Sequence, residues 1–288
     1  MLKRKNSLKI LDKTSKAKII IKKLKKENKN IPIILVPTMG ALHQGHLSLI
    51  KKAEKYNGII IVSIFVNPIQ FNDKNDLKNY PNTLRADIEK LKELGVDYLF
   101  LPTVKDIFNS SFQTTVSVNE LQKFLCGKHR PGHFNGVSTI VLKLFNIINP
   151  DIAVFGRKDF QQLTIIKRMV IDLNLDIKIL EGEIIREESG LALSSRNKLL
   201  TKKNYEIAQN IYQGLMFIRS EFKKGKKSSV QLKRLLVTFY QSKGIRNIEY
   251  INIVDRNSLI DSKTVRTGNI IAVAIKLGKI RLIDNLKF

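Results

Sequence analysis

Cysteine is scarce in this sequence, and long apolar runs are absent. Cys126 is the only cysteine among the 288 residues, which excludes an internal disulfide and a cysteine-rich zinc site. No run of about 18 apolar residues occurs, so we expect no membrane-spanning helix. The basic N-terminus is not followed by an apolar stretch with a small-residue cleavage site, so we expect no secretion signal. A reducing, cytoplasmic setting fits these features best.

Acidic residues are also few: 25 Asp and Glu stand against 51 Lys and Arg, which leaves a formal net charge of +26. A field of that strength attracts nucleic acids, ATP and other anions. However, the basic residues are mostly lysines spread along the whole chain. The sequence is also rich in Asn and Ile, and A+T-rich codons favour all three residue types. Compositional bias and a selected anion field are both open explanations, and charge alone does not indicate a nucleic-acid partner.

The first 180 residues alternate between apolar runs and amphipathic segments. The lysine-rich stretch 1–30 contains interspersed apolar residues that indicate a surface helix before the first strand. Short apolar runs predict strands at 31–36, 59–66, 98–101 and 152–155. Helices are predicted at 45–56, 82–94, 137–148 and 160–173. This alternation is typical of an α/β fold with a doubly wound parallel sheet.

Beyond residue 180 the order of the predicted elements changes. A short strand at 184–186 precedes a serine-rich loop, and two amphipathic helices follow near 202–223 and 228–243. Three further strands are then predicted at 248–254, 270–276 and 280–283. Helices followed by neighbouring strands indicate a smaller α+β domain with an antiparallel sheet. We therefore expect two domains, at 1–180 and 181–288.

The segment PTMGALHQGH, residues 37–46, lies between the first predicted strand and its helix. In an open parallel sheet, ligands bind beyond the carboxyl ends of the strands, where a helix N-terminus offers N–H groups to phosphate. Gly40 and Gly45 allow a nucleotide to approach the backbone closely. His43 and His46 are three residues apart, so both can face one ligand. Imidazole donors would stabilise the charge that grows as pyrophosphate leaves. A pair of exposed histidines in a tight turn is the alternative.

Two further loops offer partners for phosphate. The segment GRKDFQQ, residues 156–162, again follows a strand and opens a helix, where Lys158 supplies a point charge and Asp159 can cap the helix. Because this loop is topologically equivalent to the first, both should open on the same crevice. The segment LSSRN, residues 193–197, combines hydroxyls with an arginine fork and suits a phosphate clamp. Gly190 and the serines would let that segment move as a lid, although the motif alone is also typical of an ordinary loop.

Two other segments carry groups that suit an organic acid. Residues 128–134, KHRPGHF, contain the other two of the four histidines together with Arg130. The spacing permits a zinc site built from all four histidines, but it lacks a cysteine partner and nearby acidic residues are scarce, so Arg130 as an anion partner is favoured. Asn67 and Gln70 follow the second strand, and their amides donate and accept hydrogen bonds, which suits a hydroxy acid. A capped strand end is the alternative interpretation.

Taken together, five motifs resemble the successive signatures of the pantothenate synthetase family: PTMGALHQGH, IVSIFVNPIQF, KHRPGHFNGVSTIV, FGRKDFQQL and REESGLALSSRN. The resemblance runs from about residue 33 to residue 284 and includes the closing segments IEYINIVD and GKIRLIDN. Five motifs in this order are far more specific than HxGH alone. That motif by itself would indicate only the wider nucleotidyltransferase group, which includes class I tRNA synthetases.

The resemblance implies a Rossmann-like N-terminal domain, a smaller C-terminal lid domain and a homodimer. It also implies an ATP-dependent ligase that converts ATP and pantoate into pantoyl adenylate and pyrophosphate. β-Alanine then displaces AMP to give pantothenate. Mg²⁺ would accompany the ATP phosphates, with Asp87 as a candidate protein ligand. Closure of the lid would keep water from the acyl adenylate.

By matching motifs, the resemblance also assigns roles to individual residues. The expected catalytic charge stabilisers are His43, His46, Lys158 and Arg196. The other expected ATP contacts are Met39, Gly40, Ala41, Leu42, Gly45, Gly156, Asp159, Ile185, Leu193, Ser194 and Ser195. The expected contacts of pantoate and β-alanine are Gln70, Gln162, Asn67, Tyr80 and Arg130.

The sequence departs from the family's pattern at two positions. Arg157 stands where the family usually has Glu, and this change of two charge units would either strengthen phosphate binding or disturb a local ion pair. Leu193 replaces a usual Met, a volume-conserving change that we expect to be harmless. Two rival functions stay open. Another HxGH adenylyltransferase, such as one acting on phosphopantetheine, leaves three of the motifs unexplained, and a nucleic-acid-binding protein is disfavoured by the dispersed lysines.

Overall fold

The computed structural model describes residues 7–288, which divide into two compact units. The first unit comprises the residues up to 118 together with 131–157 and 165–183, and the second comprises 119–130, 158–164 and 184–288. Two short pieces of the preceding chain therefore belong to the unit that holds the C-terminus. The domain boundary at 180/181 stays a prediction. The first six residues of the expected N-terminal helical stretch lie outside the described residues.

The first unit contains a six-stranded parallel sheet with the strand order β1-β4-β3-β2-β5-β6. Its strands are β1 (Lys9–Leu11), β2 (Ile33–Thr38), β3 (Ile59–Ile64), β4 (Tyr98–Phe100), β5 (Ile152–Gly156) and β6 (Lys178–Gly182). The four inner strands are apolar and almost entirely buried, as a parallel sheet covered on both faces requires. The predicted Rossmann-like, doubly wound parallel fold is confirmed.

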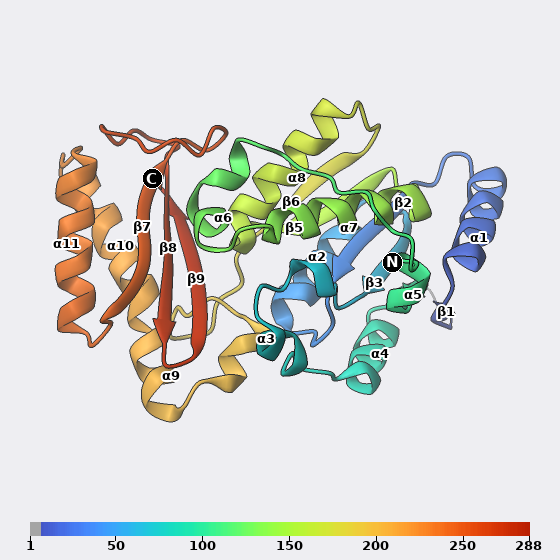
Figure 1. Ribbon diagram of the computed structural model, residues 1–288, viewed down its shortest axis with the longest axis horizontal. Coiled ribbons are helices and arrows are strands. Elements are labelled where there is room, and N and C mark those ends of the chain that lie inside the picture. The colour runs from blue at the N-terminus through green and yellow to red at the C-terminus, as the bar shows by residue number, and fades with distance from the viewer. Residues whose placement is uncertain (1–6) are drawn as a thin grey trace. The chain divides into compact units, whose positions relative to one another are not determined.

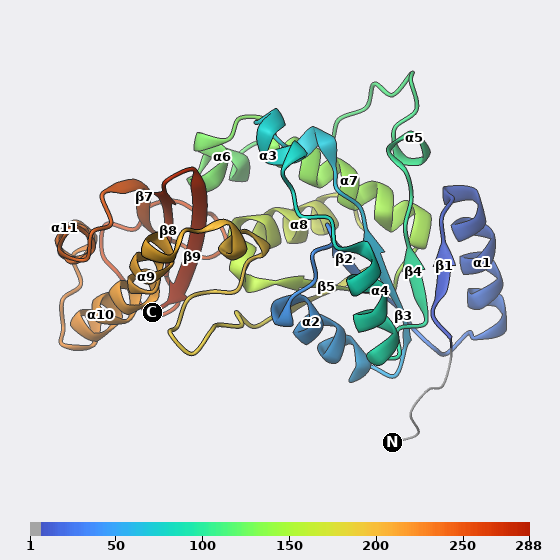
Figure 2. The same cartoon turned by 90° about the horizontal axis from the view of Figure 1, so that it is seen from below.

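Helices lie on both faces of this sheet. Figure 2 shows α2 (Gln44–Glu54) and α4 (Leu84–Glu93) on one side and α7 (His133–Ile148) on the other. Leu49 of α2 and Leu91 of α4 pack with strand residues in one apolar cluster. The other helical elements that lie wholly or partly in this unit are α1 (Thr14–Glu27), η1 (Pro68–Gln70), α3 (Lys74–Lys78), α5 (Val104–Ile107), η3 (Arg157–Asp159) and α8 (Phe160–Asp172). Within residues 7–288, no helix combines the length and the apolar character needed to cross a membrane.

The second unit is built on a three-stranded antiparallel sheet in the order β7-β8-β9. The strands are β7 (Asn247–Val254), β8 (Ile270–Leu277) and β9 (Ile280–Lys287), and α10 (Asn210–Lys223) and α11 (Ser229–Ser242) lie beside them (Figure 1). The remaining helical elements are η2 (Leu121–Lys123), α6 (Leu125–His129), η4 (Ser195–Leu199) and α9 (Lys202–Ala208). The predicted α+β character of this part of the chain is confirmed.

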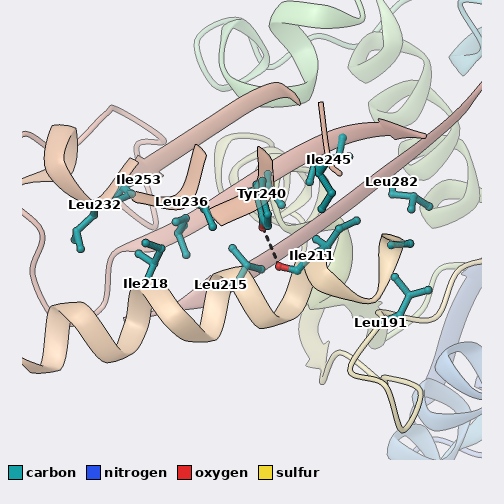
Figure 3. Close-up of a cluster of buried hydrophobic side chains, with 14 of the residues drawn as sticks. Leu191, Ile211, Leu215, Ile218, Leu232, Leu236, Tyr240, Ile245, Ile253 and Leu282 are labelled. Carbon is teal, nitrogen blue, oxygen red and sulfur yellow. Dashed lines mark hydrogen bonds between the residues drawn. The ribbon is translucent and has the colours of Figure 1, made fainter. Parts of the chain in front are cut away.

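A large apolar core joins α10 and α11 to the antiparallel sheet (Figure 3). Tyr240 is fully buried in this core, and its hydroxyl donates to the carbonyl oxygen of Ile211 at 2.8 Å. Burial raises the pKa of Tyr240 well above its ordinary value, so the hydroxyl stays a donor. Gly214 makes room for the ring, because a Cβ there would lie 2.4 Å from Cε1 of Tyr240.

Several predicted boundaries differ from the structure. The strand predicted at 184–186 is wrong: of that run, Arg186 alone forms an isolated bridge, with Ala192, and the last strand of the parallel sheet is β6 instead. The sequence pattern misses the edge strands β1 and β6, because β1 has three residues in a lysine-rich stretch and β6 has only two consecutive apolar residues between Lys178 and Glu181. The helix predicted at 202–223 breaks at Gln209 into α9 and α10, and α7 begins at His133 rather than at residue 137.

Candidate active site

The winding of the parallel sheet reverses between β2 and β5. From β2 the chain continues outward through β3 and β4, and β5 is then placed on the other side of β2. Ligands of such sheets bind beyond the carboxyl ends of the strands at this reversal. The segment after β2 contains Met39 to His46, and β5 ends at Gly156, so two predicted ATP loops begin here. A Cβ at Gly156 would meet no described atom within 4 Å, which leaves this backbone open to a ligand.

Asp87 of α4 holds the loop that follows β2. Its buried carboxylate accepts hydrogen bonds from the backbone N–H groups of Ala41 and Leu42, at 2.8 and 2.9 Å, and from the hydroxyl of Thr83 at 3.2 Å. The loop needs such support, because Gly40 and Ala41 have φ angles of +81° and +51° and the second is strained for a residue with a Cβ. These contacts occupy the carboxylate with the protein backbone, and the candidate role of Asp87 as a Mg²⁺ ligand stays a prediction.

His43 and His46 are fixed to the first turn of α2 through their Nδ1 atoms. His43 Nδ1 accepts from the N–H of Gly45 at 3.1 Å, and His46 Nδ1 accepts from the N–H of His43 at 3.3 Å. An Nδ1 atom that accepts a hydrogen bond carries no proton, so each neutral ring has its hydrogen on Nε2. The ring centroids lie 4.1 Å apart. The positive end of the α2 dipole therefore carries two Nε2–H donors, an arrangement that suits phosphate.

Gln70 and Met39 come from neighbouring strand-end segments and are in contact. The Nε2 group of Gln70 donates to Met39 Sδ at 2.8 Å, and its Oε1 accepts from Asn67 Nδ2 at 3.0 Å. Asn67 Nδ2 also donates to the carbonyl oxygen of Gly136 at 3.0 Å. Gly136 lets α7 approach, because a Cβ there would lie 2.5 Å from the carbonyl oxygen of Ile69. The Gln70 amide is thus held in one orientation beside the loop after β2.

Two predicted residues of the β-alanine end, Tyr80 and Arg130, belong to different units. The ring of Tyr80 meets Phe71 edge-on, with centroids 5.8 Å apart, one residue beyond Gln70. Arg130 belongs to the second unit and follows α6, where its backbone N–H donates to the carbonyl oxygen of Gly127 at 3.3 Å. The roles of Tyr80 and Arg130 in binding an amino acid stay predictions.

Lys158, Asp159 and Gln162 belong to the second unit. Lys158 is half-buried in η3, and its carbonyl oxygen accepts from Asn285 Nδ2 at 3.0 Å. Asp159 is exposed at the last position of η3, and Gln162 is half-buried in the first turn of α8. The residue that anchors the Lys158 backbone lies 127 positions further along the sequence, so no local motif predicts this contact.

The segment that carries the predicted phosphate clamp is also internally tied. Leu193 N–H donates to the carbonyl oxygen of Ile185 at 3.0 Å, which pairs the two ends of the Ser-rich loop. Ser194 caps η4, with its Oγ accepting from the N–H of Arg196 at 3.3 Å. Ser195 is buried and Arg196 is half-buried. The clamp residues therefore start from an ordered turn rather than a free loop.

Sequence reasoning missed two polar side chains that support these segments. Glu187 accepts from Asn197 Nδ2 at 3.1 Å and from the hydroxyl of Tyr205, and this second hydrogen bond raises the pKa of Tyr205. Buried Gln161 donates from Nε2 to the carbonyl oxygens of Leu121 and Phe124, which ties α8 to the 119–130 piece. Glu187 and Gln161 lie inside the family motifs. Their polar side chains, next to residues predicted to bind ligands, were the sequence signal that could have identified them as supporting residues.

The fold and the loop after β2 define an α/β protein of the Rossmann-like, nucleotide-binding kind. Comparison with known proteins narrows this class, because the sequence model of the Pantoate-beta-alanine ligase family matches residues 9–287. The chain belongs to the pantoate–β-alanine ligase family.

Individual relatives agree with this assignment. The chain is 45% identical over 277 residues to the pantothenate synthetase of Caldicellulosiruptor bescii, covering 96% of this chain and 98% of that protein. The crystal structure of pantothenate synthetase from Thermus thermophilus superposes with a TM-score of 0.90 at 34% identity, covering 97% of this chain and 99% of the other. The pantoate-beta-alanine ligase of Francisella tularensis, complexed with beta-gamma ATP and beta-alanine, gives 0.82 at 40% identity over 97% of both chains.

Proposed function

We propose that this protein joins pantoate to β-alanine with ATP, through a pantoyl-adenylate intermediate, and releases AMP and pyrophosphate. Membership of the ligase family supports this reaction. The observation that carries the assignment to a site is the pair of Nε2–H donors of His43 and His46 at the N-terminus of α2. The Francisella enzyme is complexed with beta-gamma ATP and beta-alanine, which supports ATP and β-alanine as two of the substrates.

In the first half-reaction, a carboxylate oxygen of pantoate bonds to the α-phosphorus of ATP while the bond to the pyrophosphate oxygen breaks. The pantoate carboxylate is already ionised at neutral pH, so this step needs no general base. It needs cations and donors where negative charge grows on the leaving pyrophosphate. His43 and His46 supply neutral donors, and Lys158 and Arg196 supply charge.

In the second half-reaction, the uncharged amine of β-alanine attacks the acyl carbon, and the bond from that carbon to the AMP oxygen breaks. The nitrogen then loses a proton to give the amide. Gln70 and Gln162 bind the hydroxy acid, and Asn67 holds Gln70 in place. Tyr80 and Arg130 serve the β-alanine end. Residues 181–288 act as a lid domain that keeps water from the acyl adenylate.

Mg²⁺ enters the site as part of the MgATP substrate. Among residues 7–288, no group of three or more His, Cys, Asp or Glu side chains could hold a metal ion, and Asp87 is engaged by backbone N–H groups. Phosphate oxygens and water would then supply most of the magnesium ligands. We further propose a homodimer in the cytoplasm, on the strength of the family resemblance. Sedimentation of the purified protein at about twice the mass of one chain would support the dimer.

A pyrophosphate-release assay tests the reaction. We expect release that requires both ATP and pantoate, and AMP formation that β-alanine accelerates. Turnover with phosphopantetheine in place of pantoate would favour the alternative adenylyltransferase. Tight DNA binding without any ATP chemistry would favour the nucleic-acid-binding alternative.

A matched pair of variants tests the histidine donor. His46→Asn keeps an acceptor near the Nδ1 position for the His43 N–H but has no donor at Nε2, whereas His46→Gln places an amide donor near Nε2. We expect His46→Asn to lower kcat by roughly 10²-fold or more with little change in Tm, because a transition-state donor is lost. His46→Gln should retain more of the rate. Equal, wild-type rates in both variants would remove His46 from the mechanism.

A further inference from the structure

The closing motif GKIRLIDN places two polar residues inside the second unit. Asp284 and Asn285 are consecutive in β9, and they are only 4% and 7% exposed. A carboxylate and an amide in such positions cost free energy unless they are well partnered. Their partners therefore indicate what the pair does.

Asn285 fixes the backbone of Lys158. Its Nδ2 donates to the Lys158 carbonyl oxygen at 3.0 Å, and its own N–H donates to Asp284 Oδ1 at 2.7 Å. Lys158 sits in the single 3₁₀ turn η3, which has little hydrogen bonding of its own. The side-chain bond from β9 thus sets where the lysine stem begins, and hence where its ammonium group can reach.

Asp284 fixes the segment that leads to the phosphate clamp. Arg186 donates to both oxygens of its carboxylate, at 2.6 and 2.9 Å, and the guanidinium is stacked on the ring of Tyr212 at 3.7 Å. The same guanidinium donates to the carbonyl oxygen of Gly190 at 3.1 Å, which closes the turn 186–190. The planar guanidinium of Arg186 is thus fixed in one orientation by the carboxylate, the carbonyl oxygen and the aromatic ring.

Backbone pairing next to Arg186 also fixes the residues of the predicted phosphate clamp, 193–196. Arg186 is bridged to Ala192, and the next pair outward joins Leu193 N–H to the carbonyl oxygen of Ile185 at 3.0 Å. Ser194 follows immediately and caps η4. The strand β9 therefore holds, through two consecutive side chains, two segments that the chain separates widely.

The electrostatics of Asp284 agree with this arrangement. Burial raises the pKa of Asp284, and the hydrogen bonds and charge of Arg186 oppose that rise, as does the charge of Lys158. The charges of Arg186 and Lys158 both favour the ionised form of Asp284, although burial outweighs them and its pKa stays raised.

We infer that Asp284 and Asn285 are positioning residues for the adenylation step: Asn285 sets Lys158, and Asp284 sets the 186–196 segment through Arg186, so that both contact one triphosphate. The inference rests on the proposed function, because the ligand of both segments is ATP. It predicts that loss of either side chain lowers the rate without removing any group that touches the substrate.

Asn285→Ala tests the first half of this inference, with Asn269→Ala as a matched control. Asn269 lies in the same unit, is 9% exposed and likewise donates from Nδ2 to a backbone carbonyl, that of Val254 at 3.3 Å. Both variants lose one buried amide, but only Asn285 holds a predicted ATP segment. We expect Asn285→Ala to reduce kcat/KM for ATP at least 10-fold relative to Asn269→Ala, since small displacements of a catalytic group are costly. Equal kcat/KM values in the two variants would overturn the inference.

Arg186→Lys tests the second half and keeps the inference testable if the alanine variant does not fold. Lysine preserves the charge next to Asp284 but cannot form the two-pronged bond. We expect weaker MgATP binding by calorimetry, at least 5-fold in Kd, and faster amide hydrogen exchange at 191–196 in the MgATP complex. Unchanged Kd and exchange would contradict a positioning role for Asp284. Calorimetry needs no turnover, so failure of the inference is distinguishable from failure of the wild-type protein to release pyrophosphate with pantoate.

Discussion

Replacing Asp87 by Asn should loosen the loop that carries His43 and His46 while leaving the size of the side chain unchanged. The carboxylate now receives the N–H groups of Ala41 and Leu42 on separate oxygens. A carboxamide has a single acceptor oxygen, so one of these N–H groups would face an NH₂ group instead. The variant therefore loses one hydrogen bond to a charged group and leaves one buried donor without a partner.

The expected cost is large enough to measure by thermal unfolding. Losing a hydrogen bond to a charged group and stranding its donor destabilises by about 2–4 kcal/mol. At roughly 2–4 °C per kcal/mol, Tm should fall by about 5–15 °C. Because the loop also carries the two donors, KM for ATP should rise about 10-fold or more in the pyrophosphate-release assay.

Asp97→Asn is the matched control for this variant. Asp97 is also buried in the first unit and accepts a backbone N–H, that of Ile60 near the start of β3, at 2.9 Å. This is the amino end of the strand, away from the nucleotide loops, so the variant should lose stability and keep its KM for ATP. If Asp87→Asn left both Tm and KM unchanged, the anchoring role would be refuted. A normal Tm together with a raised Mg²⁺ requirement would instead support Asp87 as a metal ligand.

Three other substitutions test separate parts of the structure. Burial raises the pKa of Glu249, but the hydrogen bond and charge of Arg281 outweigh burial, so the net pKa is lowered. The pair therefore stabilises the folded protein at pH values above the ordinary pKa of Glu, and this stabilisation is lost as the pH falls through the lowered pKa of the folded state. Glu249→Gln should cost about 1–3 kcal/mol in denaturant unfolding at pH 7, with the deficit shrinking below about pH 4. Gly214→Ala gains about 1 kcal/mol of helix propensity, but its Cβ would lie 2.4 Å from the fixed ring of Tyr240, and a net loss of about 1–2 kcal/mol in urea unfolding is expected. Gly156→Ala meets open space, so Tm should hold while KM for ATP rises several-fold, and an unchanged KM would show that the nucleotide does not approach there.

The central strands and the nucleotide loop were predictable because their signals are local. Runs such as Ile33–Val36 are β-branched and buried on both faces, so their pattern identifies them without knowledge of neighbours. The HxGH segment follows such a run directly, and strand-end position alone makes it a candidate. Edge strands carry a weaker signal, and Lys178–Gly182 is hard to recognise because one of its faces is partly exposed and charged.

The supports of the candidate site were not predictable, because they join residues far apart in the sequence. Asp87 reaches the loop after β2 from a different helix, and in the sequence alone a solitary acid suggests a metal ligand. Asn285 anchors the backbone of Lys158 from the last strand, and nothing in the sequence of either segment indicates contact with the other. A local pattern predicts which residues could meet a ligand, but the residues that hold them follow from packing alone.

The packing shows a consequence of Arg157 that differs from the two considered from the sequence. Its Nε donates to Glu181 at 2.7 Å and its Nη1 to Glu183 at 2.8 Å, while Lys167 also pairs with Glu181. The hydrogen bond to Glu181 raises the pKa of Arg157, so the guanidinium is stabilised in place. Glu183 is 69% exposed and adds little, but Glu181 is 13% exposed and the pairing with it is shielded from water. Two cations are thus balanced by two carboxylates at the end of β6. The family's usual Glu at this position would instead add a third carboxylate, so the charge change is absorbed by a local ion-pair network and leaves Lys158 as the proposed phosphate partner in this loop.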